Sequence, residues 1–359
     1  MTVISSPQPL PPVQSPSKAR SKLMFYGRFI FVSTIFLTGF YSGSLRGNPQ
    51  FQPNNMLLAD CNQKQTIWGK AGAPSVQICN QNPYQKSLLP GNTLASAEYK
   101  AQKWLANKTN VRDAMYWNSY GKYTHDKFDA FDVMAPCSFK CTGECREDTS
   151  KIVCGAETLQ PGCIIYSIGS NNNWVFEEKI YDMTPCEIHT FDCTGPTYRF
   201  QPPARISDRH RFHHICLAAE SVPPPEHPEP DVSGDYGVVG AMKTLQSIQK
   251  QLNHTRLDLL KLDIEGFEWP IFESWPELDN LEASSKVALP MQILMEVHYR
   301  TAMHELWPEK GVIFKDEVDI VEFQAHLLRM GYVVAHRDDN MECPHCTELT
   351  LLRHKCVVA

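Results

Sequence analysis

Two segments of the 359-residue chain carry side chains whose types and spacing suit a nucleoside cofactor. Gly169 follows a stretch of strand character at 164–167, and a polar turn through Ser170 and Asn171 comes before a helical segment. A glycine at a strand-to-helix turn lets backbone amides approach a ligand closely, although the same pattern also suits an ordinary tight turn. Asp192 ends the strand-like run EIHTF. A carboxylate there can accept hydrogen bonds from ribose hydroxyls, and a helix cap is its alternative role.

A third segment supplies acids that suit proton transfer. Asp263 and Glu265 are separated by one residue at the end of an apolar run, so we expect them to point to the same face near a strand tip. Clustering and desolvation can raise the pKa of one of them, which suits proton removal from a hydroxyl. The alternative is that one of them caps the helix beginning near Trp269. His298, just past the strand-like ILMEV, is a second candidate base, with a structural role as its alternative.

Alternating strand and helix patterns predict the element order of the main domain. The expected strands are Gly162–Ile168, Glu187–Phe191, His213–Ala218, Leu257–Ile264 and Met291–Val297, and the expected helices are Asn173–Met183, Val239–Leu252 and Trp269–Glu273. Helical connections force neighbouring strands to pair in parallel, which predicts an α/β sandwich. A further helix ending at Gly331 and two closing strands predict an antiparallel hairpin at the carboxyl-terminal edge.

The amino terminus predicts membrane insertion. Residues 1–22 are rich in Pro and Ser and contain basic side chains, and 23–45 form an apolar run near the roughly 20 residues needed to cross a bilayer. The excess of positive charge before this run places the tail in the cytosol, so we expect a type II signal anchor of the secretory pathway, in the Golgi or endoplasmic reticulum, with a lumenal catalytic domain. A cleaved signal peptide is the alternative. Residues 46–92 then read as a polar stem, 93–154 as a helical cap and 155–359 as the core.

Thirteen cysteines suit an oxidising compartment. The clusters CSFKCTGEC and CPHC are expected to form disulfides, with zinc binding or free thiols as alternatives, and no metal site is assigned. Sequons at Asn107 and Asn253 could be glycosylated in the same compartment. The net charge of −6 and the lack of a long basic stripe argue against a nucleic-acid partner.

The ordered set of motifs resembles a known family. The segments IIYSIGSNNNWVFE, HTFDCTG, RFHHICLA, LLKLDIEGFEWPIF, QILMEVHY and CTELTLLR are similar to the membrane-anchored methyltransferase-like proteins, whose domain is related to the FkbM-type branch of class I S-adenosylmethionine enzymes. The similarity runs from about Ala95 to the carboxyl terminus. It implies a Rossmann-like seven-stranded sheet, S-adenosylmethionine over the first and second strand ends, and a methyl acceptor near the fourth.

The resemblance also implies roles for individual residues. Ser167 stands where the related pattern has an acid two residues before the glycine, so we place it with Gly169 in the set that contacts the methionine half of the cofactor. Leu217 ends the expected third strand, where it would flank the adenine, and plain core is its alternative. The expected reaction is O-methylation of a lumenal glycan, glycoprotein or small hydroxylated acceptor. A lumenal glycosyltransferase that uses the D-x-E triplet with a metal, and a catalytically inactive binding module, are the alternatives.

Overall fold

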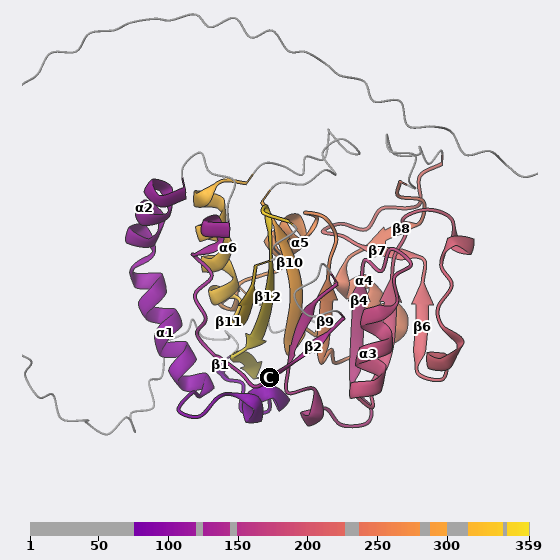
Figure 1. Cartoon of the computed structure of the whole chain (residues 1–359), viewed down its shortest axis with the longest axis horizontal. Coiled ribbons are helices and arrows are strands. Elements are labelled where there is room, and N and C mark those ends of the chain that lie inside the picture. Colours follow the sequence, from indigo (N-terminus) through magenta and orange to yellow (C-terminus); the bar gives the residue numbers. More distant parts are fainter. Residues whose placement is uncertain are drawn as a thin grey trace, which may run out of the picture. The chain divides into compact units, whose positions relative to one another are not determined.

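The computed structural model describes residues 75–119, 125–143, 149–226, 237–280, 288–299, 315–339 and 343–358. Figure 1 shows their arrangement. Within these ranges no helix is both long and apolar enough to cross a bilayer. The cytosolic tail (1–22), the signal anchor (23–45) and the stem as far as residue 74 lie outside the described residues, so these expectations stay predictions.

A seven-stranded sheet forms the centre of the domain, in the order β11-β12-β10-β9-β4-β5-β6. Its strands are β4 (Ile164–Ile168), β5 (Glu187–Phe191), β6 (His210–His213), β9 (Leu259–Leu262), β10 (Gln292–His298), β11 (Tyr332–Asp338) and β12 (Cys346–Arg353). Neighbouring strands are parallel except where β12 pairs with β10 and β11. The predicted Rossmann-like α/β fold, with an antiparallel carboxyl-terminal hairpin, is confirmed.

The central strands are apolar because both of their faces are covered. Successive side chains along a strand point to opposite faces. Accordingly, Ile165 and Leu259 pack in one hydrophobic cluster, whereas Tyr166 and Leu260 pack in the other. A parallel sheet buried on both faces needs near-continuous apolar runs, which explains why its central strands can be recognised from sequence.

Among the described residues, six α-helices pack on the sheet or beside it: α1 (Leu94–Ala106), α2 (Lys108–Ser119), α3 (Val175–Met183), α4 (Leu245–Leu252), α5 (Glu268–Ser274) and α6 (Glu317–Arg329). Capping boxes begin α1, from Thr93 to Ser96, and α6, from Asp316 to Asp319. Residues of α4, α5 and α6 join one hydrophobic cluster and residues of α3 join the other. The helices α1 and α2 lie beside α6 at the β11 end of the sheet (Figure 1).

The folded part begins earlier than the sequence predicts. The strand β1 (Ser75–Ile78) pairs with β13 (Lys355–Val358), a 3₁₀ turn η1 (Pro83–Ser87) follows, and a disulfide joins Cys79 to Cys356. Residues 75–92 therefore belong to the domain, and the stem boundary at residue 92 is wrong. The sequence misses this because β1 is short and pairs with a strand 277 residues away.

Two further predictions of secondary structure are wrong in part. The region 93–154 is not all helical, because β2 (Phe139–Thr142) and β3 (Lys151–Cys154) form an antiparallel hairpin. The third strand of the sheet is β6, not 213–218. The apolar residues after it form β7 (Ile215–Leu217), which pairs with β8 (Ala241–Lys243) in a separate two-stranded sheet, and α4 therefore starts only after the cap at Thr244. As the edge strand, β6 needs fewer apolar residues.

Short 3₁₀ segments occupy several connections: η2 (His125–Phe128), η3 (Ala156–Thr158), η4 (Thr197–Arg199), η5 (Ala204–Ile206) and η6 (Leu278–Asn280). Disulfides join Cys137 to Cys154, Cys163 to Cys186, Cys193 to Cys216 and Cys343 to Cys346, in addition to the pair at the termini of the domain. Cys141 is also disulfide-bonded. The structure thus favours the disulfide interpretation of the cysteine clusters, including CPHC.

Candidate functional site

The turn after β4 is built from residues that tolerate a left-handed backbone. Gly169 has φ +77°, and Asn171 and Asn172 have φ +45° and +59°. Asparagine adopts this region more easily than other side chains with a Cβ. The amide of Gly169 donates to the carbonyl of Phe191 at 3.0 Å, so the turn is held against the end of β5.

Asp192 lies immediately beside this turn. One of its carboxylate oxygens accepts a hydrogen bond from the backbone amide of Asn171 at 2.7 Å. The other accepts from the amide of Thr194 at 2.9 Å and from its hydroxyl at 2.6 Å. The predicted juxtaposition of the glycine turn and the downstream acid is therefore present, and backbone hydrogen bonds fix the position of the carboxylate.

Two buried hydroxyls lie at the same end of the strands. The hydroxyl of Ser170 in the turn has no hydrogen-bond partner within the part of the chain that the structure describes, whereas the hydroxyl of Ser167 in β4 interacts with the carboxyl group of Glu177. A buried polar group without a partner is costly, so the Ser170 hydroxyl together with Asp192 suits a polar ligand such as the methionine and ribose groups of S-adenosylmethionine. Leu217, by contrast, lies in β7 and packs in the hydrophobic core, so it does not end the third strand as predicted.

A carboxyl group that no sequence motif marks lies next to this end of the strands. Glu177 of α3 is buried and accepts a hydrogen bond from the hydroxyl of Thr190, which is the strand-register partner of Ser167. Burial raises the pKa of Glu177, and the positive charge of Lys261 opposes this shift. Glu177 therefore brings a carboxyl group from α3 to the paired strands β4 and β5. It lies beside Ser167, the position at which the related pattern has an acid. Its sequence position, inside a helix, gave no signal of this role.

Asp263 connects the turn to the tip of β9. A Cβ on Gly169 would lie 1.9 Å from the carbonyl oxygen of Asp263, so the two backbones are in direct contact. The Asp263 carboxylate lies 3.3 Å from Nζ of Lys151 and 3.6 Å from Nζ of Lys261. Lys261 also donates to the carbonyl of Gly169 at 2.7 Å. Although burial favours the neutral acid, the two lysines hold the pKa of Asp263 below its ordinary range.

Lys151 of the β2–β3 hairpin is the centre of a buried ion cluster that no sequence motif predicts. Its Nζ lies 2.5 Å from Glu348 and 3.9 Å from Glu296. Burial and the neighbouring carboxylates raise the pKa of Glu296 to about 9 and, with burial as the main cause, that of Glu348 to about 7. Glu296 is therefore neutral at pH 7, whereas Asp263 stays ionised. The only hint in the sequence was a lysine at the start of the apolar KIVC.

Glu265 and His298 form a second group beside this cluster. Glu265 has φ +56° and is exposed, and its carboxylate lies 3.6 Å from Nε2 of His298. The left-handed residue ends the strand alternation, so Asp263 faces lysines while Glu265 faces the histidine. Nδ1 of His298 lies 2.9 Å from the buried carboxylate of Glu268. Although burial disfavours the charged ring, Glu268 raises the pKa of His298 to about 10, which opposes its use as a base at neutral pH.

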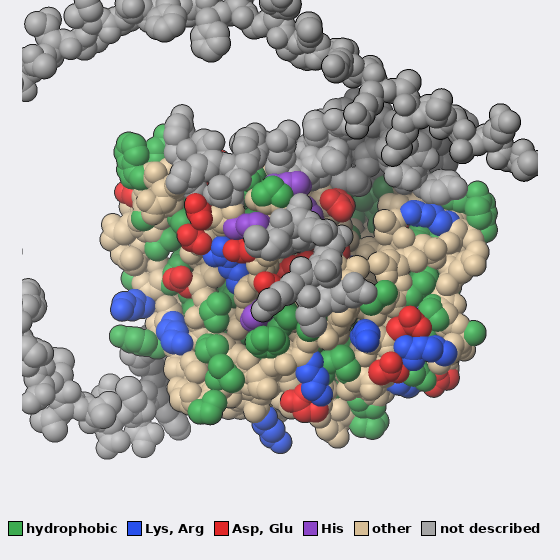
Figure 2. All heavy atoms as spheres, viewed as in Figure 1, with side chains coloured by type: hydrophobic (Ala, Val, Ile, Leu, Met, Phe, Trp, Pro, Cys, Tyr) green, Lys and Arg blue, Asp and Glu red, His purple; other side chains and the backbone are tan. Residues whose placement is uncertain are grey.

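Gly169, Asp192, Asp263 and His298 lie at the carboxyl ends of the parallel strands β4, β5, β9 and β10. In the orientation of Figure 1, acidic and histidine side chains are visible close together on this part of the surface (Figure 2). Ligands of open α/β sheets bind at that end of the strands. A family model described as a methyltransferase domain matches residues 100–353.

The chain belongs to this methyltransferase domain family. The membership confirms the predicted enzyme class, a methyltransferase domain whose cofactor is S-adenosylmethionine. Among curated proteins, the chain is 28% identical over 185 residues to the probable methyltransferase-like protein 24 of Rattus norvegicus, which covers 52% of this chain and 44% of that protein. It is 26% identical over 167 residues to the Homo sapiens protein of the same name, covering 46% and 39%. The chain therefore spans less than half the length of the relatives it matches.

Solved structures show a more distant likeness. A putative rRNA methylase from Clostridium thermocellum has 10% identity and a TM-score of 0.31, over 55% of this chain and 89% of that one. An S-adenosylmethionine-dependent methyltransferase from Mesorhizobium loti has 10% identity and a TM-score of 0.29, over 54% and 92%. At these values the fold assignment rests on the strand order described above.

Proposed function

We propose that the protein is an S-adenosylmethionine-dependent methyltransferase that methylates a hydroxyl held at the tips of β9 and β10. One observation carries the proposal: the Gly169 turn contacts both Asp192 at the end of β5 and Asp263 at the end of β9. A cofactor bound along the turn and an acceptor at Asp263 would therefore be neighbours. Placing two reactants side by side accounts for much of the rate enhancement in a transfer of this kind.

The cofactor end of the site would be formed by four residues. Asp192 would accept hydrogen bonds from the ribose diol, and Gly169 with the hydroxyls of Ser167 and Ser170 would contact the methionine portion. S-adenosylmethionine supplies the reactive methyl on its sulfonium, so the protein mainly has to orient the acceptor and remove its proton. The backbone bonds that already hold Asp192 and Asn171 would position the carboxylate before binding.

Asp263 is the group best suited to receive the acceptor proton. Its side chain is 26% exposed, so an acceptor can reach it, and its low pKa keeps it ionised at neutral pH. Glu296 is protonated at that pH and His298 is already charged, so neither can take up the acceptor proton. A weakly basic carboxylate still serves when proton loss accompanies methyl transfer, because the hydroxyl becomes far more acidic as its oxygen bonds to the methyl group.

We further propose that the acceptor is a lumenal glycan, glycoprotein or small hydroxylated molecule, and that the protein is a type II membrane protein of the secretory pathway. Five disulfides among the described residues support an oxidising compartment. Both sequon asparagines, Asn107 and Asn253, are exposed at helix ends, as a glycosylated side chain must be. The exposed Glu265 at the mouth of the site suits hydrogen bonding to sugar hydroxyls.

Calorimetry with S-adenosylhomocysteine tests the proposal on the full chain. We expect binding by the wild type, at least a tenfold loss in Asp192→Ala, and no loss in Asp208→Asn, an exposed acid on the connection between β5 and β6. Asp263→Asn should retain the affinity but lose methyl transfer to a glycan panel with isotopically labelled cofactor. Failure to bind the ligand at millimolar concentration would favour the inactive module, and manganese-dependent affinity for a nucleotide diphosphate would favour the glycosyltransferase.

A further inference from the structure

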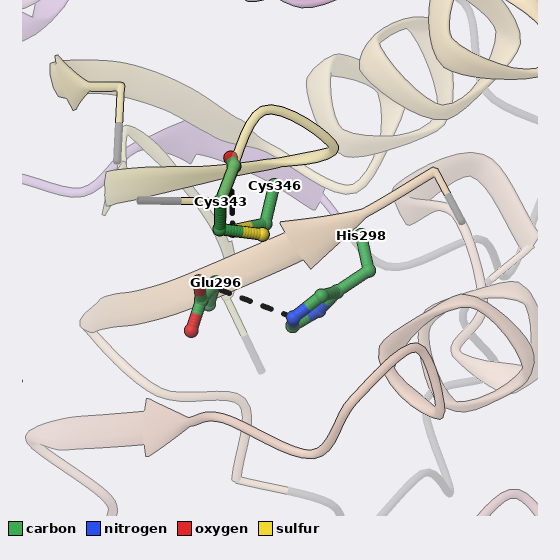
Figure 3. A group of neighbouring side chains, drawn as sticks. All are labelled: Glu296, His298, Cys343 and Cys346. Atoms are coloured by element: carbon green, nitrogen blue, oxygen red, sulfur yellow. Dashed lines mark hydrogen bonds and ion pairs between the residues drawn. A yellow bond between two sulfur atoms is a disulfide. The ribbon is translucent and has the colours of Figure 1, made fainter. Parts of the chain in front are cut away.

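Four side chains of the kinds that bind transition metals converge at the tip of β10. They are Glu296 and His298 on the strand, and Cys343 and Cys346 at the start of β12. One ligand atom of each lies within 4.8 Å of the ligand atoms of all the others. Figure 3 shows the two cysteine sulfurs above β10, with the Glu296 carboxylate and the His298 ring turned toward each other beneath them.

The histidine has the hydrogen bonding of a metal ligand. Its Nδ1 lies 2.9 Å from the Glu268 carboxylate, which also accepts the backbone amide of His298 at 2.8 Å. Glu268 is fully buried and accepts a second backbone bond, from Gly266. Nε2 is thereby directed toward Glu296, 3.9 Å away. Histidines that bind zinc in proteins usually have one ring nitrogen fixed by a carboxylate in this way, while the other binds the metal.

The donor set selects zinc. Two cysteines separated by two residues, one imidazole and one carboxylate give a four-ligand set that is typical of tetrahedral zinc. Soft thiolates disfavour magnesium and calcium, which prefer oxygen ligands alone.

In this structure the two sulfurs are joined to each other. The Cys343–Cys346 disulfide has a Cα–Cα distance of 5.5 Å, and the Cys346 amide donates to the carbonyl of Cys343 at 3.2 Å. A disulfide cannot supply thiolate ligands, because the thiolate is the form that binds a metal. We propose that Glu296, His298, Cys343 and Cys346 form a zinc site that becomes available only when this disulfide is reduced.

Reduction of the Cys343–Cys346 disulfide requires two electrons, which a thiol or a phosphine supplies. The reductant is oxidised as the sulfur–sulfur bond breaks and two thiols form. Zn²⁺ then displaces the two thiol protons, the carboxyl proton of Glu296 and the proton on Nε2 of His298 as its four bonds to the protein form. Four protein ligands leave no open position, so the zinc is structural. The zinc would hold the 343–346 segment against β10. Because Glu296 is both a zinc ligand and a neighbour of Lys151, reduction of the disulfide would also alter the ion cluster beside Asp263.

Cobalt and zinc titrations of the purified full chain test this inference. With a phosphine reductant, which does not chelate the metals as a dithiol does, we expect one equivalent of zinc by equilibrium dialysis and a thiolate-to-cobalt charge-transfer band. Without reductant we expect neither. Cys343→Ser/Cys346→Ser should abolish the band, and His298→Gln and Glu296→Gln should each weaken zinc binding at least tenfold. Cys79→Ser/Cys356→Ser, which removes a different disulfide, should leave the band unchanged.

Circular dichroism on each sample shows whether the domain stays folded. Binding that persists in the Cys343→Ser/Cys346→Ser variant overturns the inference, as does a folded, reduced wild type that takes up no metal. Loss of fold on reduction that zinc does not reverse also counts against it, since a structural zinc adds its binding free energy to folding. The readouts require no methyl transfer, so their outcome is independent of the proposed activity.

Discussion

Gly169 and Asp263 touch through their backbones at the point where the cofactor side of the site meets the acceptor side. A Cβ added to Gly169 would lie 1.9 Å from the carbonyl oxygen of Asp263. The glycine is therefore required by the packing of β4 against β9, and this holds with or without a ligand. Because Gly169 has no side chain, Asp263 at the end of β9 can lie directly against the turn that follows β4.

Gly169→Ala is expected to destabilise the domain by more than the cost of its backbone conformation alone. Gly162→Ala is the matched control, because Gly162 has φ +85° and nothing lies within 4 Å of its added Cβ. Both variants pay roughly 1–2 kcal/mol for a left-handed residue with a side chain. Overpacking against Asp263 should add about 1–3 kcal/mol at Gly169 only. Equal unfolding free energies in urea for the two variants would contradict this explanation.

Lys151→Met is expected to destabilise the domain by about 3–5 kcal/mol, since it leaves the buried carboxylate of Glu348 and the partly exposed carboxylate of Asp263 without one of their cations. Lys140→Met, on the same hairpin, removes a half-exposed partner 3.6 Å from Glu157 and should change stability by less than about 1 kcal/mol. Adding Glu348→Gln to the Lys151 variant should recover part of the loss, because it removes one uncompensated charge. Urea denaturation measures all three, and a double variant as unstable as the single one would argue against a charge effect.

The sequence predicted the parts of the site that lie on continuous motifs. Gly169, Asp192 and Asp263 were placed correctly relative to their strands, because parallel strands of an α/β sheet bring their carboxyl ends together. Lys151 and Glu177 could not be found in this way. Each comes from an element with no motif of its own, a hairpin and a helix, and each gains its role only when the chain folds against the sheet.

The same limit explains the errors at β6, β7 and β1. The apolar ICLA favours a strand at 213–218, whereas the edge position of β6 tolerates the polar His-Arg-Phe-His sequence. The pairing of β1 with β13 depends on partners at opposite ends of the domain. Periodicity reports burial along one segment, and it carries no information about which distant segment provides that burial.

A buried histidine cluster on β5 and β6 should make the domain sensitive to acid. Nδ1 of His189 lies 2.9 Å from Nε2 of His213, and Thr190 bonds to His210 at 2.9 Å. Burial, followed by the charges of His254 and His213, lowers the pKa of His189 to about 3, with Glu187 at 3.3 Å as the nearest acid. Burial likewise lowers the pKa of His210 to about 4.

The direction in which stability changes with pH follows from proton binding. An unfolded histidine has a pKa of about 6.5. Between that pH and about pH 4, His189 and His210 each bind a proton in the unfolded chain but stay neutral in the folded domain. Stability should therefore fall as the pH is lowered, by up to about 1.4 kcal/mol per pH unit for each of the two histidines. His189→Gln should remove one of these contributions, which makes the unfolding free energy less dependent on pH between 6 and 4 than in the wild type. The difference between the two proteins cancels the other titrating groups, so parallel pH profiles in urea titrations would show that His189 takes up its proton in the folded state.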